Sequence, residues 1–275
     1  MSNRSIHTLL KNWDEECPLT REEAVEVLNL PEEEMDTLME CALRTKYKGK
    51  KVSVQLLTNV RSGNCTQNCA YCAQSKDSQA EIEKYKRVSD EKLYGDNDLV
   101  DEKHLARHCI GLSGIGFSDE EIEDLADRIR EMKKKDTQIC CSIGFLTEKQ
   151  ARILKDAGLD RINHNLNSSR SFYPEICTTH TYDQRVNNIK MLQSLGFEIC
   201  SGGIVGMGES KEDIVDMLMD LREINPESVP INFLLPIPGT KLADRDISEL
   251  TPDYCMKVLC LARLMVPKSD IRCAA

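Results

Sequence analysis

Three closely spaced cysteines are the residues of this sequence best suited to chemistry. Cys65, Cys69 and Cys72 follow the pattern C-x3-C-x2-C, on a loop expected at the end of the first strand. Three neighbouring thiolates are soft ligands that suit an iron–sulfur cluster or zinc. A structural zinc normally has a fourth thiolate or imidazole nearby, and the next 30 residues contain neither. The pattern therefore favours a four-iron cluster with one iron open to a small molecule.

Alternating strands and helices must position this loop. Short apolar runs rich in β-branched residues predict seven strands, near 53–60, 108–113, 138–144, 160–166, 197–205, 229–235 and 269–274. Helical patterns between them begin at residues that commonly cap helices, namely Ser118, Thr147, Thr181 and Ser210. Such alternation is typical of a parallel α/β fold.

The chain divides into two parts by pattern. Residues 1–50 contain two amphipathic helical segments, the first opened by a capping box at Thr20, and form an N-terminal helical extension. Residues 51–275 are predicted to form a (β/α)8 TIM-type barrel of the α/β class that lacks its last strand. Residues 93–106 contain Gly95, Asp96, Asn97 and Asp98, which are poor residues for a helix interior, so this helix is expected to start late or to be broken.

Composition and charge exclude several classes of protein. The 275 residues are 40% hydrophobic, which is enough for a large core, and they show no apolar run of the length of a membrane span. The net charge of -10 and the lack of a basic block argue against nucleic acid as a partner and against a membrane surface. Thirteen cysteines without an export signal indicate reduced thiols. We expect a cytoplasmic protein, or one of an organellar matrix, although no transit peptide is visible.

The cysteine motif, with Tyr71 before the last cysteine, resembles that of radical S-adenosylmethionine enzymes. The segments CAYCAQS, AGLDRINHNLNSSRSFYPEICTTHTYDQRV, ICSGGIVGMGES and ESVPINFL are similar to the biotin synthase family, and the similarity runs in order from about residue 50 to 275. The resemblance implies insertion of sulfur into dethiobiotin to form biotin, with 5′-deoxyadenosine and methionine as by-products. It also implies S-adenosylmethionine, a 4Fe-4S cluster on Cys65, Cys69 and Cys72, and a 2Fe-2S cluster as the sulfur donor.

The resemblance further assigns ligands to positions of this sequence. The 2Fe-2S ligands are implied to be Cys109, Cys140, Cys200 and Arg272, with Arg107 close to them. Since side chains alternate along a strand, Cys141 should face the helices as a packed thiol when Cys140 faces the barrel interior. The implied contacts of S-adenosylmethionine are Tyr71, Asn165, Asn167, Arg185, Gly202 and Gly203. The implied contacts of the dethiobiotin ureido group are Asn163 and Asn232.

The other cysteines are interpreted as packed or incidental, and the histidines as structural or exposed. Asn163, Asn165 and Asn167 share one face of a predicted strand, so His164 should face away as a satisfied core histidine. The remaining residues of this group are Cys17, Cys41, Cys177, Cys255, Cys260, Cys273, His7, His104, His108 and His180. No carboxylate–histidine pair suggests acid–base catalysis, which agrees with radical chemistry.

The family resemblance also implies partners and leaves alternatives open. The implied partners are an electron donor of the flavodoxin or ferredoxin type, iron–sulfur assembly proteins and a second copy in a homodimer. The family continues past SDIRCAA into an eighth strand, so the chain is interpreted as C-terminally truncated and impaired in activity. Two alternatives are a radical mutase or lyase of the same subfamily and an inactive truncated homologue.

Overall fold

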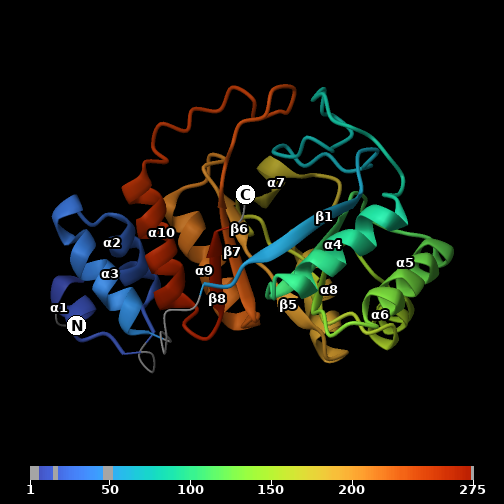
Figure 1. Ribbon diagram of the computed structural model, residues 1–275. Coiled ribbons are helices and arrows are strands. Elements are labelled where there is room, and N and C mark those ends of the chain that lie inside the picture. Colours follow the sequence, from blue (N-terminus) through green and yellow to red (C-terminus); the bar gives the residue numbers. More distant parts are fainter. Residues whose placement is uncertain (1–5, 15–17, 46–51, 274–275) are drawn as a thin grey trace.

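The computed structural model describes residues 6–14, 18–45 and 52–273. Three helices and one 3₁₀ turn precede the first strand, at Ile6–Lys11 (α1), Arg21–Leu28 (α2), Glu32–Glu34 (η1) and Met35–Arg44 (α3). They pack against the side of the molecule formed by the last helices (Figure 1). The predicted boundary at residue 50 and the predicted incidental thiol of Cys17 lie outside the described residues.

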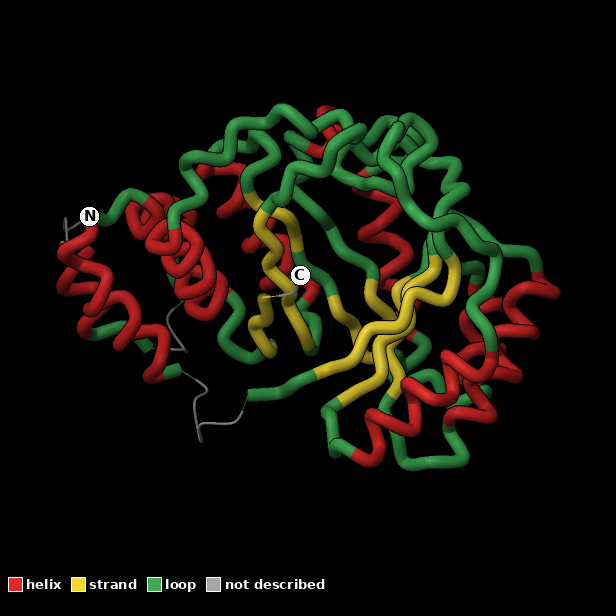
Figure 2. Tube along the Cα trace, turned by 45° about the horizontal axis from the view of Figure 1, so that its top comes forward, coloured by secondary structure: helices red, strands yellow, loops and turns green. Residues whose placement is uncertain are grey.

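The core of the chain is one parallel sheet that curves into an open half-barrel (Figures 1 and 2). Its strands are Gln55–Arg61 (β1), Arg107–Leu112 (β2), Ile139–Ser142 (β3), Arg161–Asn163 (β4), Glu198–Cys200 (β5), Gly203–Val205 (β6), Ser228–Phe233 (β7) and Asp270–Cys273 (β8). β1 to β5 follow in order, and β7 then pairs with β5, β6 and β8. β5 and β6 are two halves of the fifth predicted strand, so the seven predicted strands are all confirmed. Within the described residues, β1 pairs only with β2 and β8 only with β7, which confirms a barrel that is not closed.

A close approach between backbones explains the break between β5 and β6. A Cβ atom added to Gly202 would lie 1.9 Å from the carbonyl oxygen of Pro230 on β7. A Cβ atom on Gly203 would lie 2.1 Å from Sδ of Met217. Only glycine fits at these two positions without displacing its neighbours.

Helices cover the outer face of the sheet. They are Asp90–Glu102 (α4), Asp119–Met132 (α5), Glu148–Asp156 (α6), Tyr182–Ser194 (α8), Lys211–Ile224 (α9) and Pro252–Met265 (α10). The short helix Tyr173–Ile176 (α7) lies instead beside the loop after β1 (Figure 1), where the Ile176 carbonyl oxygen accepts a hydrogen bond from Ala70 N. Capping boxes are present at Thr20, Ser118, Thr147, Thr181 and Ser210, as their sequences predict. The sequence therefore indicates where these helices begin.

The face of the strands that packs against the helices is apolar. Ile110, Cys141, Ile162 and Ile199 lie next to one another across β2 to β5 and are fully buried against the helices. Burial of each such apolar side chain stabilises the fold by roughly 1.5–3 kcal/mol. The prediction that Cys141 is a packed thiol of the helical layer is therefore confirmed.

The prediction of a late or broken helix at 93–106 is wrong. α4 is continuous from Asp90 to Glu102 and is capped by the Ser89 side chain. Asn97 is buried, where its Nδ2 donates to the carbonyl oxygen of Met132 (3.2 Å) and its Oδ1 lies 3.2 Å from Nδ1 of His108. Contacts with distant elements thus outweigh a weak local propensity.

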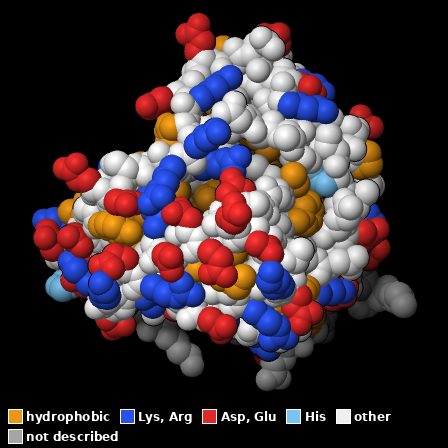
Figure 3. All heavy atoms as spheres, turned by 90° about the vertical axis from the view of Figure 1, so that its right-hand side faces the viewer, with side chains coloured by type: hydrophobic (Ala, Val, Ile, Leu, Met, Phe, Trp, Pro, Cys, Tyr) orange, Lys and Arg blue, Asp and Glu red, His pale blue; other side chains and the backbone are white. Residues whose placement is uncertain are grey.

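The outer surface of the helices mixes charges of both signs. Figure 3 shows Lys and Arg interspersed with Asp and Glu over the face that contains α5 and α6. Several of these charges form ion pairs, such as Lys149 with Asp119 and Arg152 with Glu148. Among the described residues, no helix has the length and apolar character needed to cross a membrane.

Candidate functional site

A cavity of about 220 Å³ lies at the carboxyl ends of the strands. Its walls come from the segments that follow β1, β2, β3 and β4, and α8 adds one side. The carboxyl ends of barrel strands are where the active sites of such folds are found. The cavity is therefore the first candidate for the active site.

The predicted cluster cysteines all line this cavity. Cys65, Cys69 and Cys72 are free thiols on the loop after β1. Main-chain hydrogen bonds hold the loop in place, including one from Ala70 N to the carbonyl oxygen of Ile176 (2.8 Å). Burial raises the pKa of Cys72. Deprotonation of a buried thiol therefore calls for a compensating cation or metal cluster.

Three amides form a second wall of the cavity. Asn163, Asn165 and Asn167 all line it, although β4 ends at Asn163 and the other two follow the strand. Asn167 has a φ of 71°, a left-handed conformation that asparagine tolerates better than most residues. Its backbone pairs with Gly203, and Asn165 Oδ1 accepts a hydrogen bond from Gly202 N (3.1 Å).

His164 also lines the cavity, so the prediction that it faces away as a satisfied core histidine is wrong. Its ring packs against Phe145 with a centroid distance of 5.1 Å, and burial lowers its pKa to about 3. Its Nε2 has no hydrogen-bond partner within the described part of the chain. The strand ends at Asn163, so strict alternation no longer applies at His164.

Arg185 brings a positive charge to the cavity wall. Its guanidinium group donates to the Tyr173 hydroxyl and to the carbonyl oxygen of Asn165 (3.1 Å), and Nη2 lies 2.8 Å from Nε2 of His180. None of these three partners is a carboxylate. The charge of Arg185 is therefore not neutralised by these partners. Because Arg185 lies at the edge of the cavity, it is suited to bind an anionic group of a ligand.

The predicted ligands of the second cluster meet in the barrel interior. Cys109 on β2 is paired in register with Cys140 on β3. Cys200 on β5 accepts a hydrogen bond from Asn163 Nδ2 (3.2 Å) and lies 4.0 Å from Nη1 of Arg272 on β8. The structure thus brings together three thiols and one guanidinium group from four strands.

The protonation of these thiols responds to their neighbours. A hydrogen bond with Cys140 lowers the pKa of Cys109 to about 7 despite burial, and the charges of Arg272, Arg107 and Arg161 act in the same direction. The same thiol pair and burial raise the pKa of Cys140. Cys109 is thus the more readily deprotonated thiol of the pair, beside positive charges that favour a thiolate ligand.

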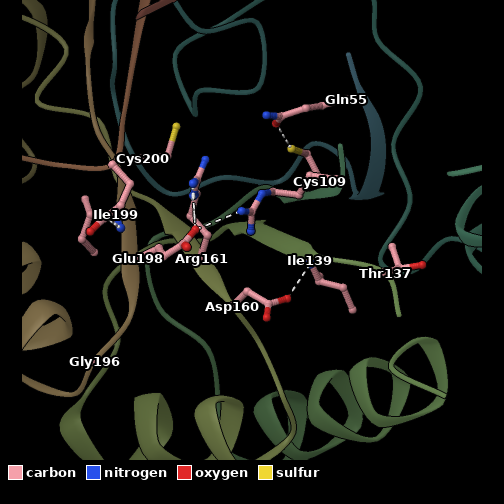
Figure 4. Close-up of polar contacts among 12 residues, drawn as sticks. Gln55, Cys109, Thr137, Ile139, Asp160, Arg161, Gly196, Glu198, Ile199 and Cys200 are labelled. Carbon is pink, nitrogen blue, oxygen red and sulfur yellow. Dashed lines mark hydrogen bonds and ion pairs between the residues drawn. The ribbon is translucent and has the colours of Figure 1, made fainter. Parts of the chain in front are cut away.

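Sequence analysis misses several polar residues around this interior site. Figure 4 shows Gln55, Cys109, Arg161, Glu198 and Cys200 on neighbouring strands. The Cys109 thiol donates to Gln55 Oε1 (3.0 Å), and Arg161 forms an ion pair with Glu198 (2.7 Å). Arg161 is in register with Cys140, so the alternation of β3 and β4 was the signal that could have found it.

Arg107 belongs to the same group, as the family resemblance implies. Its Nη2 donates to Glu198 Oε2 at 2.9 Å. Its Nη1 is buried and has no partner among the described residues. A buried donor without a partner fits a site that receives an acceptor from a ligand.

Of the remaining predicted ligand contacts, one lines the cavity and the others do not. Tyr71 lines it, whereas Gly202 and Gly203 lie behind Asn165 and Asn167 and contribute close backbone packing. Asn232 is on β7, where its Oδ1 is buried without a partner in the described part of the chain. Asn232 therefore has one free acceptor for a donor group of a ligand.

Two residues interpreted as structural or incidental contact the cluster loop. The Cys69 thiol donates to Cys177 Sγ (3.8 Å), and Cys177 Sγ lies 3.3 Å from Nδ1 of His180. The hydrogen bond between the thiols raises the pKa of Cys69 and lowers that of Cys177. Cys177 is buried as predicted, but it is not incidental, and His180 lines the cavity.

The other members of that group behave as predicted. Cys41 and Cys260 are buried in the core, Cys255 is partly exposed and Cys273 is exposed. His108 is fully buried between Thr58 and Asn97. His7 pairs with Glu34, and His104 has a φ of 51°.

Comparisons with solved structures agree with the fold. Methylornithine synthase aligns with a TM-score of 0.84 and 20% identity over 97% of this chain and 78% of its own. The FeFe-hydrogenase maturase HydG from Carboxydothermus hydrogenoformans aligns with a TM-score of 0.83 and 20% identity, over 98% of this chain and 65% of its own. At this identity the likeness shows the fold alone.

Comparisons of sequence are more specific. Residues 59–221 match the Radical SAM superfamily, and residues 230–275 match the Biotin and Thiamin Synthesis associated domain. Biotin synthase of Geobacillus kaustophilus (strain HTA426) is 42% identical over 259 residues, which are 93% of this chain and 77% of that protein. Biotin synthase of Bacillus subtilis (strain 168) is 41% identical over 92% of this chain and 76% of its own length. The chain therefore belongs to the biotin synthase family within the radical S-adenosylmethionine superfamily.

Proposed function

We propose that this chain inserts sulfur into dethiobiotin to form biotin, and releases 5′-deoxyadenosine and methionine from S-adenosylmethionine. One observation carries the proposal beyond family membership. Two separate sets of three cysteines, one at the mouth of the half-barrel and one in its interior, lie on either side of Asn163. Asn163 lines the cavity of the first set and donates to Cys200 of the second. A substrate next to Asn163 can thus reach both sets.

The first set fits a 4Fe-4S cluster. Cys65, Cys69 and Cys72 are free, partly exposed thiols that line one cavity, and a cluster with three thiolate ligands keeps one iron open. When bound, the cluster and S-adenosylmethionine supply one-electron chemistry that removes hydrogen atoms from unactivated carbons. The chain itself positions the reactants and limits the access of water to them.

Arg185 and the amides are proposed to bind S-adenosylmethionine. The cationic Arg185 lacks a carboxylate partner among its hydrogen bonds, so it can pair with the carboxylate of this ligand. Asn165 and Asn167 offer amides for ribose hydroxyls, and Tyr71 offers a ring beside the adenine. Gly202 and Gly203 let the strand approach closely enough to hold these asparagines in place.

The second set fits a 2Fe-2S cluster with an unusual fourth ligand. Cys109, Cys140 and Cys200 would hold it together with Arg272, whose Nη1 already lies 4.0 Å from Cys200 Sγ. When bound by these residues, the cluster would supply the sulfur atom of the product. The residues around it, Arg107 and Arg161, place positive charge where thiolates and sulfide accumulate negative charge.

Two asparagines are proposed to hold the ureido group of dethiobiotin. Asn232 has a buried Oδ1 without a partner among the described residues, and a ureido N–H is a suitable donor for it. Asn163 has an amide at the cavity wall. Hydrogen bonds at these positions would fix the reacting carbons between the two sets of cysteines.

Partners and location follow from the same chemistry. One-electron chemistry requires a low-potential donor, which we propose to be of the flavodoxin or ferredoxin type. The clusters require iron–sulfur assembly proteins. Thiol ligands in this number are stable in a reducing compartment, which supports a cytoplasmic location. The homodimer is proposed from the family resemblance alone. Cross-linking of the purified chain and its sedimentation would test the dimer.

The test is an anaerobic turnover experiment. The chain is reconstituted with iron and ³⁴S-labelled sulfide, then mixed with dethiobiotin, S-adenosylmethionine and a reductant. The proposal predicts ³⁴S-labelled biotin together with 5′-deoxyadenosine and methionine. Cys65→Ala should abolish all three products, whereas Cys141→Ala, which removes a packed thiol outside both sets, should retain them. Formation of 5′-deoxyadenosine without biotin would contradict the proposal.

A further inference from the structure

We propose that Cys69 and Cys177 are a redox-sensitive pair. In the chain without its cluster, hydrogen peroxide converts the two thiols to a disulfide, and a thiol reductant reverses the reaction. The disulfide would prevent Cys69 from binding the 4Fe-4S cluster, and this consequence rests on the proposed role of Cys69 as a cluster ligand. The disulfide itself rests only on the geometry of the two thiols.

Two loops that are far apart in sequence hold the sulfur atoms in contact. Cys69 Sγ and Cys177 Sγ are 3.8 Å apart, although 108 positions separate the residues in the chain. Asn68, the neighbour of Cys69, joins the loops through its side chain. Its Oδ1 accepts from Thr178 N (3.0 Å), and its Nδ2 donates to the Thr178 hydroxyl (2.7 Å).

The main chain adds a second link between the same loops. Ala70 N donates to the carbonyl oxygen of Ile176 at 2.8 Å. Residues on both sides of the thiol pair are therefore fixed, so a disulfide needs movement of the two side chains rather than assembly of distant segments. Pre-organisation of this kind raises the effective concentration of one thiol at the other.

The two cysteines differ in exposure, which assigns their roles. Cys69 lines the cavity at the mouth of the half-barrel, where a small oxidant can reach it. Cys177 is 4% exposed and lies behind it, within 3.3 Å of His180 Nδ1. Cys69 is thus the thiol that meets peroxide, and Cys177 is the one that resolves the oxidised product.

The reaction balances with peroxide as the only oxidant. The Cys69 thiol passes its proton along the hydrogen bond to Cys177 Sγ, and the Cys69 sulfur attacks one oxygen of hydrogen peroxide. The O–O bond breaks, and once that proton reaches the departing hydroxide, a sulfenic acid and one water have formed. The Cys177 sulfur then attacks the Cys69 sulfur, the S–O bond breaks, and a second water leaves. Two thiols lose two electrons in total, and peroxide accepts them.

A disulfide removes Cys69 from the cluster set and protects it at the same time. A sulfenic acid without a nearby thiol is oxidised further to sulfinic and sulfonic acids, which no ordinary thiol reductant reverses. The disulfide stops this oxidation at a reversible stage. We therefore expect Cys177 to preserve the capacity of the loop to take up iron after oxidation.

A metal ion is the competing occupant of this position. Ligand atoms of Cys69, Cys177 and His180 all lie within 4.8 Å of one another, a spacing that a soft cation could use. The Arg185 guanidinium lies 2.8 Å from His180 Nε2 and opposes a second positive charge there. The structure therefore favours the disulfide, and zinc is tested directly below.

The experiment uses the full chain, freed of iron and zinc with a chelator. It is treated with hydrogen peroxide, alkylated, digested without reductant and analysed by mass spectrometry. The proposal predicts a peptide pair that joins Cys69 to Cys177, absent in Cys177→Ser and in Cys69→Ser, but retained in Cys255→Ser. Pairing of Cys69 with Cys65 or Cys72, or no cross-link, would overturn it.

A second measurement follows recovery of the loop. Wild-type chain that has been oxidised, reduced with dithiothreitol and reconstituted should regain most of its iron, about ten-fold more at the cluster loop than Cys177→Ser treated in the same way. Cys177→Ala serves as a second variant, and circular dichroism checks the fold of both. Equal recovery in all chains would overturn the proposal. Binding of one zinc ion per chain when zinc is added back to the chelator-treated protein, with protection of both thiols from peroxide, would also overturn it. The cross-link is measured on a chain without clusters. Absence of the cross-link therefore says nothing about biotin formation, and absence of biotin formation says nothing about the cross-link.

Discussion

Arg161 and Glu198 are paired in register on the neighbouring parallel strands β4 and β5, and their side chains form an ion pair of 2.7 Å. The same carboxylate accepts a hydrogen bond from Arg107 at 2.9 Å. One acidic side chain thus holds two guanidinium groups next to Cys109 and Cys140. This arrangement keeps positive charge at the interior thiols while it satisfies part of the hydrogen-bonding capacity of each arginine.

Glu198→Gln should therefore leave two arginines without their shared anion. We expect the free energy of unfolding to fall by about 1–2 kcal/mol, less than for a fully buried pair because the Glu198 side chain is 42% exposed. Urea unfolding of the iron-free chain measures this change. Glu131→Gln, which breaks the exposed pair with Lys134, is the control and should have little effect. Equal effects of the two substitutions would contradict the account.

Asn97→Ala tests the reason why α4 is continuous. Loss of the amide leaves the Met132 carbonyl without this donor and His108 Nδ1 without this partner, so the free energy of unfolding should fall by about 2 kcal/mol. Thermal or urea unfolding provides the measurement. Asp98→Ala, at the neighbouring exposed position, should change stability much less. An Asn97→Ala chain as stable as the wild type would show that these two hydrogen bonds are not the reason for the continuous helix.

Asp213 gives the protein a defined sensitivity to acid. Burial acts to raise the pKa of this carboxyl, but hydrogen bonds from Ser169, Ser210 and Ser171 outweigh it and lower the pKa to about 2. Because an unfolded Asp has a pKa near 3.9, the stabilisation is complete above about pH 4 and is lost as the pH falls towards 2. Asp213→Asn should be less stable at pH 7 by about 1–2 kcal/mol and should lose less stability on acidification. The free energy of unfolding of both proteins is measured from pH 7 to pH 2. An equal loss of stability in the wild type and in Asp213→Asn over this range would contradict the prediction.

Arg185→Lys tests the site proposed for the carboxylate of S-adenosylmethionine. The lysine keeps the charge but loses the fork of donors that contacts Tyr173 and Asn165, so affinity should fall about 10–100-fold. Equilibrium dialysis of the reconstituted chain gives the dissociation constant. The control is Arg170→Lys, an arginine 54% exposed that pairs with Asp183 on the outer surface. Unchanged affinity in Arg185→Lys would exclude this role.

Local signals in the sequence account for much of the fold. In each of the capping boxes at Ser118, Thr147 and Ser210 the two interacting residues are three positions apart in the chain, and the structure has a helix after each. The alternation of Cys140 and Cys141 follows from strand geometry alone, and it separates an interior thiol from a packed one. These features need no knowledge of distant contacts.

Features that depend on distant contacts could not be predicted in this way. Arg161 meets Glu198 only because β4 and β5 have one particular register. Cys177 reaches Cys69 only because the segment after α7 lies against the cysteine loop. His164 reaches the cavity because β4 ends one residue before it. Neither the register of strands far apart in the chain nor the path of a loop is encoded in local pattern.

The central claim, that two iron–sulfur clusters occupy two separate sets of cysteines, is tested most directly by Mössbauer spectroscopy of the anaerobically reconstituted chain. The account predicts signals of both a 4Fe-4S and a 2Fe-2S cluster. Cys140→Ala should lose the 2Fe-2S signal alone, and Cys141→Ala, its buried neighbour on the other face of β3, should keep both. A wild-type chain with the four-iron signal alone, or a Cys141→Ala chain that loses the two-iron signal, would contradict it.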